Sequence, residues 1–136
     1  MSGLLDVLID VAVGLLVPSG RRRAKREARL FAAGGAVTFP ACVLGTPSYC
    51  RELIVFLSAS RTALDASPTE VAELHRRSIP VGRLELVRVR DRQRADPLAV
   101  QPTWRVAECR DGSAELLMGC APQHMGYIVS ALTGTA

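Results

Sequence analysis

Four arginines at alternate positions have the spacing that best suits ligand binding: Arg88, Arg90, Arg92 and Arg94. In an extended chain successive side chains point to opposite faces, so all four would project from one face. Such a guanidinium stripe can bind phosphate groups, whether of a lipid head group or of a nucleic acid. The alternative is a solvated edge strand whose charges oppose aggregation, and the nearby acidic residues Glu85, Asp91 and Asp96 favour it.

The chain has four thiols that could hold a metal or act as nucleophiles: Cys42, Cys50, Cys109 and Cys120. Cysteine pairs of structural zinc sites lie about two to four residues apart, and these pairs do not. Three of the thiols fall in predicted strands, where cysteine behaves as a small apolar residue. Cys50 is the exception, because the charge of Arg51 could lower the pKa of its thiol. We expect reduced, buried thiols, with Cys50 the first to react, and no metal site.

The sequence shows no set of acid, base and nucleophile that could form a catalytic site. His75 and His124 have no carboxylate or cysteine at ligand spacing, and no serine lies in a Gly-x-Ser-x-Gly turn. Aromatic residues make up 4% of the chain, too few for a platform on which nucleic-acid bases stack. We therefore predict no catalytic residue, no cofactor and no nucleic-acid partner.

The N-terminal region joins an apolar run, residues 4–17, to a dense basic cluster. On a helix, Asp6, Asp10 and Gly14 would form one narrow polar stripe. Apolar side chains would cover the rest of the surface, among them Leu5, Leu8, Ile9 and Leu16. The basic cluster follows at once and consists of Arg21, Arg22, Arg23, Lys25, Arg26 and Arg29. The net charge of the chain is +4, whereas residues 21–29 alone contribute six positive charges and one negative charge, so the rest of the chain is close to neutral.

Several interpretations of this region remain open. A secretory signal peptide would carry its positive charge before the apolar core, not after it. A membrane span needs about 20 apolar residues and tolerates carboxylates poorly. A helix in the membrane interface, or one docked in the groove of a partner protein, accommodates the polar stripe. An ordinary helix packed on the domain is the remaining alternative. We favour membrane association, with the basic cluster on the anionic surface and the rest in the cytoplasm.

Beyond Gly34-Gly35, which we take as the domain boundary, the pattern predicts mostly strands. The predicted strands are residues 36–44, residues 53–58, a return strand beginning within 61–64, and residues 84–90. In the first strand Pro40 indicates an edge or a bulge. In the last strand the alternation slips at Leu86-Val87, which indicates an irregularity. A polar connection follows at 91–101. The last helix would begin at Pro122, end at Gly134 and share one apolar face: Met125, Ile128, Val129 and Leu132.

Two parts of this region are harder to interpret. Ser67-Pro68-Thr69-Glu70 fits a capping box that would start a short helix through Val71 and Leu74, but a strand over 73–79 is the alternative. Asp111-Gly112 predicts the turn of a hairpin over 104–120, with Cys109 opposite Ala114. That register sets Glu108 opposite Glu115, an unfavourable pair, so a shifted or bulged register stays open.

Bacterial pleckstrin-homology-like domains contain a stretch, IPLxxIxxVxV, that resembles Ile79-Pro80-Val81-Gly82-Arg83-Leu84-Glu85-Leu86-Val87-Arg88-Val89. In that family a strand ends at the Ile-Pro and the next strand carries the valines. Residues 53–64 are similar to the hairpin that precedes this stretch in the family. Residues 104–132 are similar to the family's last hairpin and the helix that follows it. The resemblance covers about residues 36–133, with departures at 67–77 and in the long connection at 91–102. It implies a partly open barrel of two sheets closed by a helix, and binding rather than catalysis.

The predicted fold is mainly β (α+β), a small split barrel of about six to seven antiparallel strands with a C-terminal helix. An N-terminal apolar helix and the basic cluster (1–33) precede the β domain (34–136). Small actinobacterial proteins with one N-terminal membrane helix and such a domain are similar. We expect a non-enzymatic adaptor or accessory subunit at the plasma membrane that binds a protein partner. A soluble subunit whose helix docks into a larger assembly is the alternative, and a small thiol-dependent or ligand-binding enzyme is least favoured.

Overall fold

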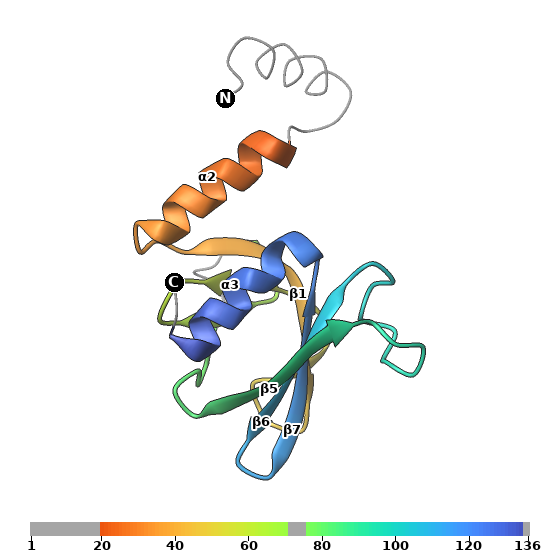
Figure 1. Ribbon diagram of the computed structural model, residues 1–136. Helices are drawn as coiled ribbons and strands as arrows, with labels where there is room; N and C mark the ends of the chain where they lie inside the picture. The colour runs from red at the N-terminus through yellow and green to blue at the C-terminus, as the bar shows by residue number, and fades with distance from the viewer. Residues whose placement is uncertain (1–19, 71–75, 135–136) are drawn as a thin grey trace.

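The computed structural model describes residues 20–70 and 76–134, which form one antiparallel sheet and two helices (Figure 1). The helices are α2 (Gly20–Ala32) and α3 (Pro122–Thr133). The strands are β1 (Val37–Gly45), β2 (Arg51–Ala59), β3 (Leu64–Ser67), β4 (Arg77–Ile79), β5 (Leu84–Asp91), β6 (Arg105–Asp111) and β7 (Ala114–Cys120). The predicted N-terminal apolar helix lies outside the described residues.

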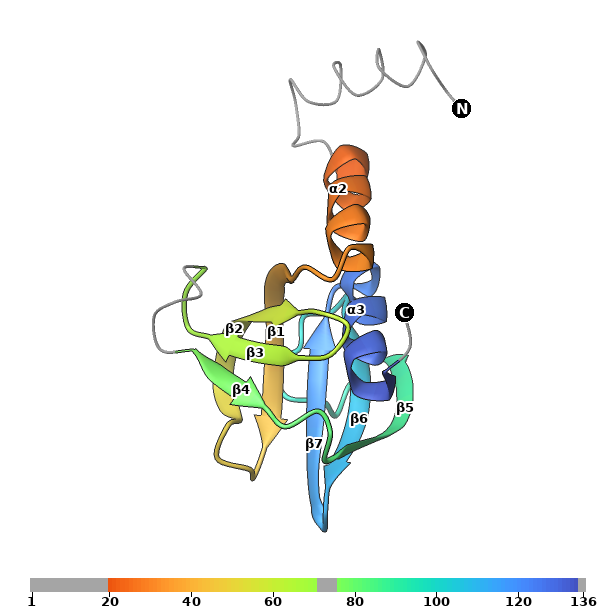
Figure 2. The same ribbon diagram turned by 90° about the vertical axis from the view of Figure 1, so that its left-hand side faces the viewer.

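The seven strands are joined in the order β4-β3-β2-β1-β7-β6-β5, and every neighbouring pair is antiparallel. The sheet curls into a half-barrel, and α3 lies against its concave side (Figures 1 and 2). The main core fills the space between them, with fully buried Phe39, Leu57, Leu116, Met118 and Ile128. A mainly β half-barrel with a C-terminal helix is therefore confirmed.

Helix α3 follows the sequence prediction closely. Proline at its start costs no helical hydrogen bond, because the first N–H groups of a helix have no partner within it. Gly134 ends the helix in the left-handed conformation (φ 72°), and its N–H donates to the carbonyl of Ser130. Met125 and Ile128 are buried against the sheet.

Strand β1 lies in the middle of the sheet, yet it contains Pro40. This proline is opposite Phe56 of β2, and pairing with β7 begins only one residue later, at Ala41. The missing N–H therefore falls where β1 has a partner on one side only. The register between β1 and β2 then shifts between Ala41 and Val43. Of the edge position and the bulge that Pro40 predicted, an irregularity close to the proline is therefore the one observed.

The hairpin of β6 and β7 forms as predicted, but its register was wrong by two residues. Asp111 pairs with Ala114, so Gly112-Ser113 is the turn, and Gly112 takes the positive φ of 63° that such a turn requires. Cys109 then lies opposite Leu116. The observed register replaces the unfavourable Glu108–Glu115 pair by Arg110 opposite Glu115, which is electrostatically favourable.

Two other sequence predictions have mixed outcomes. Ser67 is the last residue of β3 rather than a helix cap, although its Oγ accepts a hydrogen bond from the Thr69 N–H at 3.3 Å. The helix predicted through Val71 and Leu74 lies outside the described residues. Strand β4 occupies the end of the alternative strand, and the irregularity in β5 is confirmed between Leu86 and Arg88.

Candidate functional site

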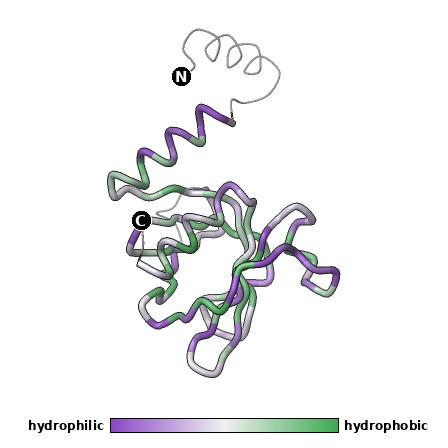
Figure 3. The backbone as a smooth tube through the Cα atoms, viewed as in Figure 1, coloured by the Kyte–Doolittle hydropathy of each residue, from purple (hydrophilic) through white to green (hydrophobic). Residues whose placement is uncertain are grey.

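Helix α2 carries the basic cluster and sorts its side chains onto two sides. At 100° per residue, the side away from the sheet holds Arg21, Arg22, Lys25, Arg26 and Arg29, here called the cationic face. All five are exposed. The opposite side holds the half-buried Glu27 and the buried Phe31. Figure 3 shows that α2 is hydrophilic over most of its length and projects from the sheet.

Two contacts hold α2 against the β domain, by which we mean the sheet together with α3. The rings of Phe31 and Tyr127 pack with their centroids 4.7 Å apart. The carboxylate of Glu27 lies 3.2 Å from Nε2 of His124, and Arg23 approaches the same carboxylate at 3.8 Å. These contacts fix the inner side of α2, so the cationic face is directed away from the β domain.

His124 is a positioning residue that sequence reasoning did not identify. Its ring stacks on Phe39 at 4.6 Å with an interplanar angle of 10°, which orients Nε2 toward α2. Nδ1 is buried and has no hydrogen-bond partner in the described part of the chain. No local signal could have revealed this role, because Glu27 and His124 are 97 positions apart.

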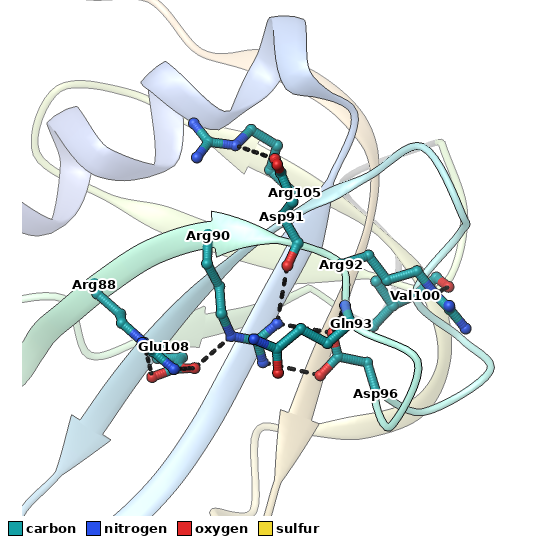
Figure 4. A network of polar contacts seen from close by, with 9 residues as sticks. All are labelled: Arg88, Arg90, Asp91, Arg92, Gln93, Asp96, Val100, Arg105 and Glu108. Carbon is teal, nitrogen blue, oxygen red and sulfur yellow. Dashed lines mark hydrogen bonds and ion pairs between the residues drawn. The ribbon is translucent and has the colours of Figure 1, made fainter.

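The predicted arginine stripe does not form one continuous face. Strand β5 ends at Asp91, so Arg92 and Arg94 lie in the loop that follows. Figure 4 shows Arg92 beside the end of the strand. The guanidinium of Arg88 donates to both oxygens of Glu108, at 2.8 and 3.1 Å. Arg92 donates to the carbonyl of Val100 at 2.9 Å.

Arg90 is the most engaged of the four arginines. It donates to both oxygens of Asp96 at 2.8 Å and also to Glu108 (Figure 4). Hydrogen bonds from Arg90 lower the pKa of Asp96 to about 2, and those from Arg88 and Arg90 lower the pKa of Glu108 to about 2. Because β5 is an edge of the sheet and its arginines bind carboxylates of the same chain, the geometry favours the edge-strand interpretation. Phosphate binding by the stripe stays a prediction.

All four cysteines are free thiols and buried. Burial raises the pKa of Cys42 and of Cys50 to about 11, and that of Cys109 and of Cys120 to about 12. Arg51 does lower the pKa of Cys50, but desolvation is the larger effect. Arg51 therefore does not activate the Cys50 thiol, because the residue belongs to the core rather than to an exposed turn.

A groove opens on the concave side of the sheet, at the start of β2. Its volume is about 680 Å³, and residues from β2, β3, β4 and the loop before β2 line it. Tyr49, in that loop, donates a hydrogen bond to Asp111 at 2.9 Å, and Arg83 donates to the same carboxylate at 2.7 Å. The loop is thereby tied to the β6–β7 turn, which gives the groove a fixed wall.

Three further findings concern the class of site. The described residues contain no group of three or more side chains that could hold a metal ion. Neither α2 nor α3 is long and apolar enough to cross a bilayer, and the residues before α2 lie outside the described ranges. Comparison with protein-family models, with curated proteins and with solved structures found no match to this chain.

Proposed function

We propose that this chain is a non-enzymatic adaptor of the plasma membrane. Residues 4–17 anchor it, the cationic face of α2 rests on the anionic cytoplasmic surface, and the β domain binds a protein partner in the cytoplasm. The observation that carries the proposal is the direction of the cationic face. Five exposed basic side chains point away from the domain, on a helix that directly follows the apolar segment.

The electrostatic contribution of the cationic face is large enough to matter. A basic residue near an anionic membrane surface contributes about 1 kcal/mol. Five such residues therefore contribute several kcal/mol, which adds to the burial of apolar residues before them. Because Glu27 and Phe31 hold α2 on the domain, the membrane would also orient the β domain.

The pleckstrin-homology-like character of the β domain is part of the proposal. Its support is the order of seven antiparallel strands followed by a helix. Strand β4 ends at Ile79, just before Pro80, and β5 carries Val87 and Val89, as the resemblance implies. A role in binding a protein partner follows from that resemblance.

Vesicle binding tests the membrane contact. The full chain is mixed with vesicles of phosphatidylcholine alone or with added phosphatidylserine, and the bound fraction is measured by co-sedimentation. We expect the anionic lipid to strengthen binding, and Lys25→Glu/Arg29→Glu to reduce that gain by at least about tenfold, since two favourable charges become unfavourable. The gain should also fall as salt increases.

A matched control carries the same change of charge elsewhere. Arg51→Glu/Arg77→Glu alters two exposed arginines outside α2 and outside the arginine stripe, and it should leave the gain from anionic lipid nearly unchanged. Equal losses in both variants would contradict the assignment to α2. Equal binding of the natural chain to both kinds of vesicle would remove the anionic-surface contact and favour a helix that docks in a partner protein.

A further inference from the structure

We propose that the groove at the start of β2 binds an extended peptide segment of the protein partner, one that combines apolar side chains with a carboxylate. The inference rests on the proposed adaptor function and specifies the chemistry of the partner. Three observations carry it: an exposed extension of the core, an edge of β2 that extends beyond β3, and two adjacent arginines.

The core pattern of β2 continues into the groove, where its apolar side chains are exposed. Val55, Leu57 and Ala59 alternate along the strand and are all buried. Leu53 is the next position in this alternation, yet 76% of it is exposed, and its neighbour Ile54 is 41% exposed. Both line the groove, together with buried Val55 and Ala66. The apolar floor of the half-barrel is thus open to solvent here, where an apolar side chain of a partner would find contacts on several sides.

The edge of β2 beside this floor extends beyond the end of its described partner β3. Strand β3 pairs with β2 only from Phe56 to Ala59, because β3 is four residues long. On the other side, the register jumps from Val55 opposite Ala41 to Arg51 opposite Val43. No described strand therefore pairs with residues 52–54. Unpaired N–H and C=O groups at a strand edge are what an added peptide strand binds.

Two guanidinium groups stand at the rim of the groove. Nη1 of Arg51 donates to the Ser48 carbonyl at 3.0 Å, and Nη1 of Arg77 approaches the same oxygen at 3.4 Å. The two like charges therefore lie close together, although they come from different strands. Neither arginine contacts a carboxylate in the described part of the chain.

This pair of arginines selects the charge of the occupant. The charged side chains that line the groove are Arg51, Arg77 and Glu52, so the lining carries a net positive charge. A carboxylate placed between two guanidinium groups would form charge-assisted hydrogen bonds and relieve their mutual repulsion. The groove volume of about 680 Å³ leaves room for two or three side chains.

Selection from a library of short random peptides displayed on phage tests this inference. The target is the full chain in detergent micelles without anionic lipid, so the result does not depend on the membrane contact. We expect enriched peptides in which an acidic residue stands beside apolar residues. Binding of a synthetic copy, measured by fluorescence anisotropy, should weaken by roughly tenfold or more in Leu53→Ser and in Arg51→Ser/Arg77→Ser.

The controls use residues outside the groove. Leu98→Ser changes a leucine that is 91% exposed on another loop, and Arg94→Ser/Arg110→Ser removes an equal charge. Both should bind the peptide as the natural chain does, and circular dichroism verifies that each variant is folded. The inference is overturned if no such peptide is enriched, or if the groove variants bind it unchanged. A dimer in sedimentation velocity that Leu53→Ser abolishes would also overturn it, by assigning the groove to a second copy.

Failure here and failure of the membrane proposal are distinguishable. Vesicle binding depends on Lys25 and Arg29 of α2, whereas peptide binding depends on Leu53, Arg51 and Arg77. Loss of the first with retention of the second would leave a peptide-binding domain without the proposed anionic contact. The reverse result would leave a membrane-bound protein whose partner binds elsewhere.

Discussion

Glu27 of α2 and His124 of α3 meet across 97 positions of the chain, with Oε1 and Nε2 3.2 Å apart. Together with the Phe31–Tyr127 contact, this pair joins the basic helix to the domain. A basic segment on a free linker could bind a membrane without orienting anything that follows. A docked helix transmits its orientation, so the contacts of its inner side matter as much as the charges of its outer side.

Phe31→Ala should weaken the docking of α2. Phe31 is 7% exposed, and replacing a buried phenylalanine by alanine costs about 3–5 kcal/mol. We expect a cost near the lower end, because α2 lies at the margin of the domain. Amide hydrogen exchange should show loss of protection in α2 while the central strands keep theirs. Leu30→Ala, at a position 47% exposed, is the control, and equal effects of the two variants would contradict the docking described here.

Ile128→Ala should destabilise the whole β domain. The side chain is fully buried between α3 and the sheet, and such a truncation costs about 2–5 kcal/mol in the free energy of unfolding. Chemical denaturation measures it, with Gln123→Ala on the exposed side of α3 as a nearly neutral control. If Ile128→Ala were equally neutral, α3 would not be closing the half-barrel.

The contact of Arg90 with Asp96 predicts acid sensitivity. The pKa of Asp96 falls from its ordinary 3.8 to about 2, and that of Glu108 falls from 4.5 to about 2. The folded chain therefore holds these protons less tightly than the unfolded chain does. Their contribution to stability is complete above about pH 4.5 and is lost as the pH falls toward about 2. Denaturation by urea across this pH range measures it.

Asp96→Asn should lower stability at neutral pH by about 1–3 kcal/mol, because Arg90 loses one of its two carboxylate partners in a half-buried site. The loss of stability on acidification should become smaller in this variant. Asp91→Asn is the matched control: Asp91 also pairs with an arginine, Arg105 at 3.1 Å, but its side chain is 90% exposed. Exposed ion pairs contribute about 0–1 kcal/mol. If both variants lost similar amounts of stability, burial of the Arg90 site would add nothing to the strength of its ion pair.

The cysteines should react slowly with iodoacetamide in the native protein at neutral pH and quickly after unfolding. Their raised pKa values keep the thiols protonated, and burial blocks access. Cys50 should react first, because it is 9% exposed while Cys42, Cys109 and Cys120 are 0–2% exposed. Mass spectrometry after timed labelling gives the order. Native labelling of Cys50 at the rate of a free thiol would contradict its placement in the core.

The buried thiols should also make the folded chain less stable at alkaline pH. Their pKa values are raised from an ordinary 9.0, so the folded chain keeps its thiol protons at a pH where the unfolded chain loses them. Stability should be unaffected below about pH 9 and decline as the pH rises toward 11. Cys109→Ala and Cys120→Ala should reduce that decline, which denaturation curves between pH 8 and pH 11 would measure. If stability declined in both variants as much as in the natural chain, the decline would come from groups other than these two thiols.

Much of the β domain could be predicted from local patterns. Alternation in β2 and β5 and the shared apolar face of α3 are properties of neighbouring residues, and burial acts on them directly. The bulge at Leu86 is visible as a slip in that alternation. The hairpin register was less accessible, because a shift of two residues keeps the same side chains on each face and differs only in the turn and in cross-strand charge pairs.

The sequence by itself determined most of the strands, which face of α3 is apolar and that the basic residues gather before the domain. Tertiary structure alone decided what those residues contact. Pairing of β5 with β6 brings Glu108 to Arg88, and the loop after β5 brings Asp96 to Arg90. The short β3 leaves Leu53 exposed at a position where alternation predicts burial. Local patterns show which face of its own helix or strand a residue occupies. The contact partners of that residue depend on where distant helices and strands end, and therefore on the packing of the whole chain.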